Sequence, residues 1–149
     1  MRPNKSKIFR LSEKDSGFTL LELLVVLVII GLLTTIVGPQ VMKMLGNAKG
    51  DVARVQLENI GIALDLFNLD VGRYPNQEEG LKILIEKPGV LERWNGPYLK
   101  SDALPKDPWG KLYIYTNPGK GTPYSLQSYG ADGQPGGTSE NSDIILNEK

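Results

Sequence analysis

The chain of 149 residues contains no cysteine and no histidine. The absence of cysteine excludes disulfides, thiolate metal sites and thiol nucleophiles, and the absence of histidine removes the commonest general base and the usual zinc and iron ligands. Lysine plus arginine and aspartate plus glutamate each number 17, so there is no net charge to attract nucleic acid. The composition therefore argues against an enzyme and against a nucleic-acid-binding protein.

One long hydrophobic run, residues 18–37, contains a single charged residue, Glu22. As a helix rising roughly 1.5 Å per residue, it would extend about 30 Å, the thickness of one hydrocarbon core. Residues 1–17 carry five basic and two acidic side chains, so we expect this end to stay cytoplasmic. The run predicts a membrane-spanning segment over residues 18–38, with residues 39–149 forming a domain on the far side.

The carboxylate of Glu22 is costly inside a membrane, by about 2–3 kcal/mol or more unless it finds a partner. No basic side chain lies within two helical turns of it. The nearest candidate is the α-amine of Phe18, which would exist if the chain were cut after Gly17, and which a neighbouring chain could supply. A plain signal anchor is the alternative, whereas a secretory signal is disfavoured by the length of the run and by Gly38-Pro39, a poor cleavage site.

The segments from Lys14 to Gly17 and from Phe18 to Glu22, KDSG and FTLLE, resemble the signal of type IV pilins and type II secretion pseudopilins. The resemblance implies that a prepilin peptidase cuts after Gly17 and N-methylates Phe18, while the apolar segment stays in the product. Glu22 would then set the register of assembly, because a wrong axial offset leaves a carboxylate unpaired in an apolar core.

A hydrophobic pattern continues beyond the membrane segment in alternating steps of four and three residues, which predicts a helix from about Phe18 to Asp70. The positions are Val41, Leu45, Ala48, Val52, Val55, Asn59, Ile62, Leu66 and Leu69. Because Ile60, Leu64 and Phe67 widen this apolar face, we expect a head domain to cover the stripe. A dimerising coiled coil is the alternative.

Small and cyclic residues interrupt the predicted helix at Gly31, Gly38 and Pro39. Proline removes a backbone donor and disfavours helix just before it, so residues 31–39 are the predicted weak point. In the pilin-like family this stretch loosens when subunits assemble. The plainer alternative is that glycine and proline are simply common in membrane helices.

The remaining residues predict a small α+β head. Asn76 with Glu79 indicates the start of a short helix that buries Leu81, Leu84 and Ile85 and ends before Pro88. Residues 111–116 and 124–129 alternate as strands around the turn 117–121, which predicts an antiparallel hairpin, and residues 144–146 suggest a third strand. The expected fold is a type IV pilin-like α+β fold, with one long N-terminal helix packed on a small antiparallel sheet.

Several short segments of the head resemble, in order, the landmarks of the major pseudopilins of type II secretion. They are residues 72–75 (GRYP), 79–81 (EGL), 96–99 (GPYL), 104–110 (LPKDPWG) and 128–133 (SYGADG). The resemblance implies a subunit of a helical homopolymer in the periplasm that drives export of folded proteins across the outer membrane. Its implied partners are copies of itself, the prepilin peptidase, minor pseudopilins and the inner-membrane assembly platform.

Two alternatives to the major pseudopilin stay open. A type IV pilin or a minor pseudopilin is the first, although a type IV pilin usually carries a cysteine pair that this chain lacks. A membrane-anchored hydrolase using Asp107 and Asp132 is the second, although nothing in the sequence places these carboxylates together. The turn around Asp107, with Trp109 buried in the head, is better explained by structure than by a subunit contact.

The segment from Asp132 to Asp143, DGQPGGTSENSD, combines glycines with carboxylates at both ends. Oxygen ligands without histidine or cysteine suit Ca²⁺, although the segment lacks the EF-hand pattern, and a plain solvated loop is the alternative. The resemblance implies a calcium site with carboxylates from Asp132 and Asp143 and with carbonyls of Tyr129 and Gln134. Members of the family often have a second acidic or a small residue just before the last aspartate. Here that residue is Ser142, and Glu140 could substitute for it as a ligand.

Overall fold

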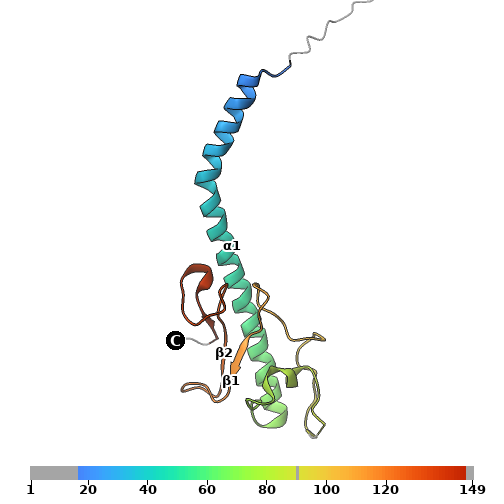
Figure 1. The fold of residues 1–149 in the computed structure, drawn as a ribbon. Helices are drawn as coiled ribbons and strands as arrows, with labels where there is room; N and C mark the ends of the chain where they lie inside the picture. Colours follow the sequence, from blue (N-terminus) through green and yellow to red (C-terminus); the bar gives the residue numbers. More distant parts are fainter. Residues whose placement is uncertain (1–16, 90, 147–149) are drawn as a thin grey trace, which may run out of the picture. The chain divides into compact units, whose positions relative to one another are not determined.

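The computed structural model describes residues 17–89 and 91–146. The predictions for residues 1–16 of the leader and for the last three residues lie outside this part. Along the chain the elements are α1 (Leu20–Val71), η1 (Gly80–Leu84), β1 (Ile114–Thr116), β2 (Ser125–Ser128), η2 (Ser139–Asn141) and β3 (Ile144–Ile145) (Figure 1). Residues up to Gly38 and residues from Pro39 onward form two units, which are described separately.

The first unit is the apolar half of α1. An 18-residue window of α1 has a mean hydropathy of 2.9, so the helix is long and apolar enough to cross a membrane. The hydroxyls of Thr34 and Thr35 donate to the carbonyls of Ile30 and Leu32 at 2.8 and 2.7 Å. These bonds satisfy two polar groups within an otherwise hydrocarbon surface.

The helix is continuous across the predicted weak point, as the expected helix from about Phe18 to Asp70 requires. Residues 31–39 are helical throughout, and Pro39 lies inside α1. Proline within a helix removes one hydrogen bond without always ending the helix, and the apolar residues on both sides continue the same pattern. Loosening of this stretch during assembly stays a prediction.

The second half of α1 presents one face to the head. Its buried apolar residues step by four and three residues along the helix and are at most 2% exposed. They are Ala53, Leu57, Ile60, Ala63, Leu64 and Phe67. They pack against residues of η1, of the β1 and β2 hairpin and of β3 in one continuous core. This inner face confirms the expected roles of Ile60, Leu64 and Phe67.

The predicted stripe from Val41 to Leu69 is not the covered face, and that prediction was wrong. Its large members are exposed, because the inner face has the same spacing but is displaced by one or two residues. At 3.6 residues per turn, this displacement turns the face by about 100° to 200° around the helix. The spacing therefore identified an amphipathic helix correctly and assigned the wrong side to the head.

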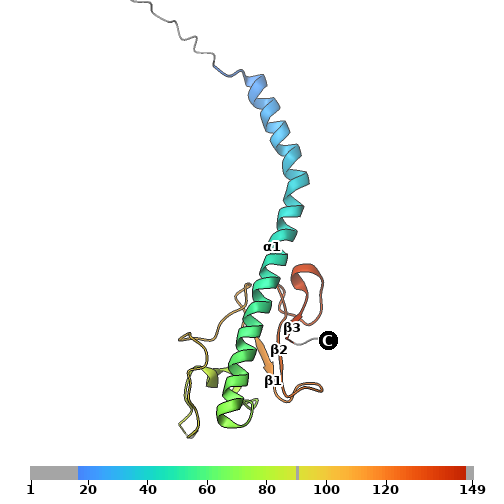
Figure 2. The same ribbon diagram turned by 180° about the vertical axis from the view of Figure 1, so that it is seen from behind.

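Three short strands form an antiparallel sheet in the order β1-β2-β3 beside the second half of α1 (Figure 2). Tyr115 faces Leu126 across the first pair of strands, and Ser128 faces Ile144 across the second. The hairpin and the third strand are thus confirmed, although the paired segments are shorter than predicted. Before β1, Leu112 pairs only through an isolated bridge to Lys106, so the strand begins at Ile114.

The short helix predicted after Asn76 is a single 3₁₀ segment, η1. Its start has the expected reciprocal hydrogen bonds, since the backbone N–H of Glu79 donates to Asn76 Oδ1 and the N–H of Asn76 donates to Glu79 Oε2, both at 2.8 Å. The buried side chains are Leu81, Ile83 and Leu84. Ile85 was expected among them, but it is the C-cap residue and is only partly buried, because a 3₁₀ segment orients side chains differently from an α-helix.

Candidate functional site

The surface of α1 that faces away from the head is strongly apolar. We call the five large residues of the second half of this surface the outer stripe: Val52, Val55, Ile62, Leu66 and Leu69. Each is between 47% and 79% exposed. Large apolar side chains exposed along one face of a helix are typical of protein or membrane contacts.

The predicted processing and assembly residues lie at the start of α1. Gly17 and Phe18 precede the helix, and the Phe18 side chain is 76% exposed. The backbone N–H of Glu22 donates to Thr19 Oγ1 at 3.2 Å, so Thr19 caps the helix and Glu22 is its third residue. A carboxylate at this position is also favoured by the helix dipole. The sequence analysis missed this role of Thr19, although the pattern T-x-x-E signals it.

The segment from Asp132 to Asp143 is closed by hydrogen bonds that backbone N–H groups donate. The N–H of Ala131 donates to the carbonyl of Glu140 at 2.8 Å, and the N–H of Gly136 donates to Asp143 Oδ2 at 2.9 Å. Gly130 has a φ of 61°, and a Cβ there would lie 2.7 Å from the Glu140 carbonyl oxygen. Only glycine fits where the two ends of the loop approach each other so closely.

One oxygen in this loop has no partner. Asp143 Oδ1 is buried and accepts no hydrogen bond within the residues that the structure describes. A buried carboxylate oxygen without a hydrogen-bond partner is costly, and a bound cation would relieve this cost. The chemistry of the donor set therefore fits a bound oxygen-seeking cation.

Two of the other predicted ligands already accept hydrogen bonds from backbone N–H groups. The carbonyl of Tyr129 accepts from the N–H of Gly133 at 3.2 Å, and Asp132 Oδ1 accepts from the N–H of Gln134 at 3.1 Å. Ser142 donates its N–H to the carbonyl of Ser139 at 3.2 Å. Across residues 17–89 and 91–146, no three acidic side chains gather as a metal cluster. A cation here would need carbonyl oxygens for most of its ligands.

The structure does not favour Glu140 as a substitute for an acidic ligand at position 142. Its side chain lies against α1, where a Cβ added to Gly46 would come within 2.6 Å of Glu140 Oε1. Gly46 is buried although it lies on a mostly exposed stretch of the helix. Glycine at this position thus makes room for the Glu140 side chain against the helix.

The turn at Asp107 is structural, as predicted. Asp107 is 4% exposed, and its Oδ1 accepts from the N–H groups of Trp109 and Lys111 at 3.1 and 2.7 Å. Its Oδ2 accepts from the Ser128 hydroxyl at 2.6 Å, and Trp109 packs against the core. Because the carboxylate is buried and engaged on both oxygens, Asp107 has no free oxygen with which to serve the hydrolase alternative.

Arg73 is likewise structural and ties the end of α1 to the capping turn. Its Nη1 and Nη2 donate to the two carboxylate oxygens of Glu79 at 2.6 and 2.7 Å. The hydrogen bond from Arg73 is the main reason that the pKa of Glu79 lies below its ordinary value. The neighbouring Tyr74 donates to Asp65 Oδ1 at 2.9 Å. These contacts give the GRYP segment a structural role and do not require a catalytic or binding role for it.

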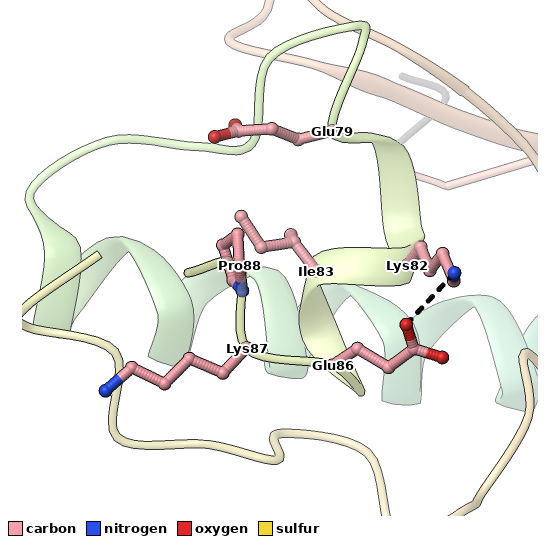
Figure 3. A pocket seen from close by; sticks show the side chains of 6 residues that line it. All are labelled: Glu79, Lys82, Ile83, Glu86, Lys87 and Pro88. Carbon is pink, nitrogen blue, oxygen red and sulfur yellow. Dashed lines mark ion pairs between the residues drawn. The ribbon is translucent and has the colours of Figure 1, made fainter. Parts of the chain in front are cut away.

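A small groove of about 170 Å³ lies over η1, lined by Ile83 and Pro88 between charged side chains (Figure 3). Lys82 and Glu86 form an exposed ion pair at 3.0 Å beside it. An exposed pair of this kind contributes little to stability or binding. The groove is shallow and carries mixed charge, so it does not resemble a site for a specific ligand.

Comparison with known proteins resolves the family. Residues 40–147 match the family model described as type II secretion system (T2SS), protein G, and residues 13–38 match the prokaryotic N-terminal methylation motif. The type II secretion system core protein G of Pseudomonas aeruginosa is 44% identical over 135 residues, which covers 88% of this chain and 94% of that protein. The chain belongs to the protein G family of type II secretion.

Further relatives agree with this assignment. Core protein G of Vibrio cholerae is 44% identical over 140 residues, covering 88% of this chain and 90% of that protein. The crystal structure of the major pseudopilin from the type 2 secretion system of enterohaemorrhagic Escherichia coli matches with a TM-score of 0.58 and 32% identity, covering 70% of this chain and 90% of that chain. The pilin-like α+β fold is confirmed, and this protein G chain is a structural subunit of the pseudopilus rather than a type IV pilin or a minor pseudopilin.

Proposed function

We propose that the chain is cut after Gly17, N-methylated on Phe18 and held in the inner membrane by residues 18–38, with the head in the periplasm. Copies then assemble into a pseudopilus whose growth pushes folded proteins through the outer membrane. The match of residues 13–38 to the methylation motif and the apolar half of α1 support this proposal. The prepilin peptidase, minor pseudopilins and an inner-membrane assembly platform are its expected partners.

The observation that carries the assembly proposal is the outer stripe. Among the residues that the structure describes, the head covers the inner face of the second half of α1, whereas the outer stripe and the large side chains of the apolar first half are exposed. Apolar segments that leave the bilayer must bury one another to avoid water. Helices packed side by side in a helical homopolymer would do so, because each subunit offers the same surfaces to the next.

Glu22 is proposed to set the axial offset between neighbouring subunits. The α-amine of Phe18 of one subunit would lie beside Glu22 of the next, since this arrangement pairs two charges that would otherwise stand alone among aliphatic side chains. Any other offset leaves both unpaired, which costs several kcal/mol and makes the register specific.

Two measurements on the purified protein test this proposal. The mass of the mature protein should correspond to a chain that begins at Phe18 and carries one methyl group. Glu22→Ala should be inserted and cut normally, yet the yield of sheared filaments should fall at least about tenfold for the loss of a buried charge pair. Glu58→Ala, at an exposed position of the same helix outside the apolar half, is the matched control.

Recovery of the protein with residues 1–17 still attached would overturn the processing step. A normal filament yield from Glu22→Ala would overturn the register role, whichever form of the N-terminus is found. A low yield from Glu58→Ala as well would show that assembly depends on the total charge of the helix rather than on Glu22.

We further propose that the loop between Asp132 and Asp143 binds calcium. The unpartnered buried oxygen of Asp143 and the carboxylate of Asp132 at the other end of the loop support this proposal. Carbonyls of Tyr129 and Gln134 and the hydroxyl of Ser142 are the expected further ligands, as Ca²⁺ takes six to eight oxygens. Bound calcium would hold the two ends of the loop together and thereby support β3.

Thermal melting of the purified protein tests the calcium site. Chelation with EGTA should lower the Tm of the head by several degrees, because a ligand that binds only the folded state stabilises it. Asp132→Ala should melt like the chelated wild type and should not respond to EGTA. Asp102→Ala, which removes an exposed carboxylate elsewhere, should keep the response. A wild-type Tm that is the same with calcium and with EGTA would overturn the calcium site.

A further inference from the structure

A lysine side chain contacts the residues that lead into the loop between Asp132 and Asp143. Lys111 Nζ donates to the carbonyl of Ala131 at 2.7 Å and to the carbonyl of Gly130 at 3.3 Å. The same ammonium lies against the backbone of Gly133, where a Cβ would come within 2.6 Å of Nζ. Lys111 therefore reaches across from the segment before β1 and holds the first turn of the loop.

The position of this lysine is set at its backbone as well as at its side chain. Its N–H donates to the buried Asp107 at 2.7 Å, and Asp107 in turn accepts from the Ser128 hydroxyl at the end of β2. The Ser128 hydroxyl also accepts from the N–H of Gly130 at 3.3 Å. Asp107 thus brings the backbone of Lys111 and the start of the loop together, so the lysine is a built part of the loop rather than a surface side chain.

The ammonium contacts carbonyl oxygens instead of carboxylates. The ion pairs found within the part of the chain that the structure describes are Arg73 with Glu79 and Lys82 with Glu86, and neither includes Lys111. A charged donor on two carbonyls makes stronger hydrogen bonds than a neutral one, and it fixes backbone oxygens as a metal ion would. The ammonium contacts Ala131 and Gly133, the two residues that flank Asp132 in the sequence.

We propose that Lys111 acts as an internal cation of the loop. Its ammonium keeps residues 129–133 folded when calcium is absent, and its charge weakens the binding of calcium to the same loop. The first effect follows from the hydrogen bonds to the Gly130 and Ala131 carbonyls. The second follows from the repulsion between the ammonium and a calcium ion bound through Asp132, since Lys111 holds the residues on either side of Asp132. Only the second effect rests on the proposed calcium site.

Loss of the ammonium should lower the stability without calcium but raise the affinity for calcium. This combination separates the proposal from a purely structural role. Removing the charge with Lys111→Met keeps most of the aliphatic stem. In EGTA the variant should melt about 5–10 °C below the wild type, because it loses two charge-assisted hydrogen bonds. Titration calorimetry with calcium chloride should show binding about threefold to tenfold tighter than in the wild type. A loop that is merely damaged would bind calcium more weakly.

Two further variants serve as controls. Lys120→Met removes the same charge from an exposed position in the hairpin turn and should change neither the melt in EGTA nor the calcium affinity. Lys111→Arg keeps the positive charge and should keep the weaker wild-type affinity.

Melting of Lys111→Met in EGTA at the temperature of Lys120→Met would overturn the ordering role. Calcium binding by Lys111→Met that is equal to or weaker than in the wild type would overturn the effect on affinity. If neither protein takes up calcium, the calcium site and the affinity effect both fail, while the melts in EGTA still decide the ordering role.

Discussion

The inner and outer faces of the second half of α1 share a spacing but differ in what covers them. On the inner face Leu57, Leu64 and Phe67 are at most 1% exposed, whereas Ile62 and Leu66 on the outer stripe are about half exposed. The inner face also contains small residues, and a Cβ at the buried Gly61 would come within 2.8 Å of the Leu146 side chain. Close approach to a sheet needs small residues between large ones, and the inner face provides them as buried glycines and alanines.

The difference teaches that hydrophobic period alone identifies an amphipathic helix but not its partner. Either face could be buried favourably, since the free energy of burial depends on the apolar area and not on the order of the residues. The head lies on the face where glycine and alanine interrupt the large side chains. The other face is left for contacts between subunits.

The largest effect is expected from alanine substitution of two nearby leucines, one on each face. Leu64→Ala, on the inner face, should lower the free energy of unfolding by about 2–5 kcal/mol, because it leaves a cavity in the core. Leu66→Ala, on the outer stripe, should change it by no more than about 0.5 kcal/mol. Urea denaturation of the purified protein in detergent measures both values.

Relative to the amount of folded protein, Leu66→Ala should reduce the filament yield more than Leu64→Ala does. Leu66→Ala should reduce assembly of a protein that is fully folded, because it removes part of the contact between subunits. Equal stability losses for the two variants would break the distinction between a covered and an uncovered face.

A smaller effect is expected from two glycines of α1. Gly61→Ala should destabilise the head by about 1–3 kcal/mol, since the new methyl group overlaps Leu146 and something must shift. At Gly50 the nearest side-chain atom to a Cβ is Ile144 Cδ1 at 3.9 Å, an ordinary contact. Gly50→Ala should therefore stabilise the helix by about 0.5–1 kcal/mol. Thermal melting of the two variants would contradict this account if both shifted the Tm in the same direction.

The smallest effect is a loss of stability in acid, to which the ion pair between Glu79 and Arg73 should contribute. The Arg73 hydrogen bond lowers the pKa of Glu79 in the folded state, so the stabilisation is present above the unfolded pKa of about 4.3 and is lost as the pH falls below it. For a partly exposed pair we expect about 1 kcal/mol or less.

Glu79→Gln isolates this contribution. The variant should be slightly less stable than the wild type at pH 7 and should lose less stability between pH 5 and pH 3. Urea denaturation at the two pH values measures the difference, and parallel curves for both proteins would exclude the ion pair as a source of acid sensitivity.

Local patterns predicted several features of this chain well. The reciprocal bonds between Asn76 and Glu79 need only two residues three positions apart, and the hairpin needs only a turn between two alternating segments. The contacts of Lys111 could not be predicted, because they join residues about twenty positions apart, which the hydrogen bond between Asp107 and Ser128 helps to bring together.

By itself the sequence determined that an apolar helix of membrane length begins near Phe18, that it continues as an amphipathic helix to about Asp70, and that carboxylates and glycines lie together near the C-terminus. These features depend on residues close along the chain, where propensity and period act directly. The tertiary structure alone decided which side of the helix is covered and which lysine holds the loop. Both depend on shape and distance between segments remote in sequence, which no local pattern encodes.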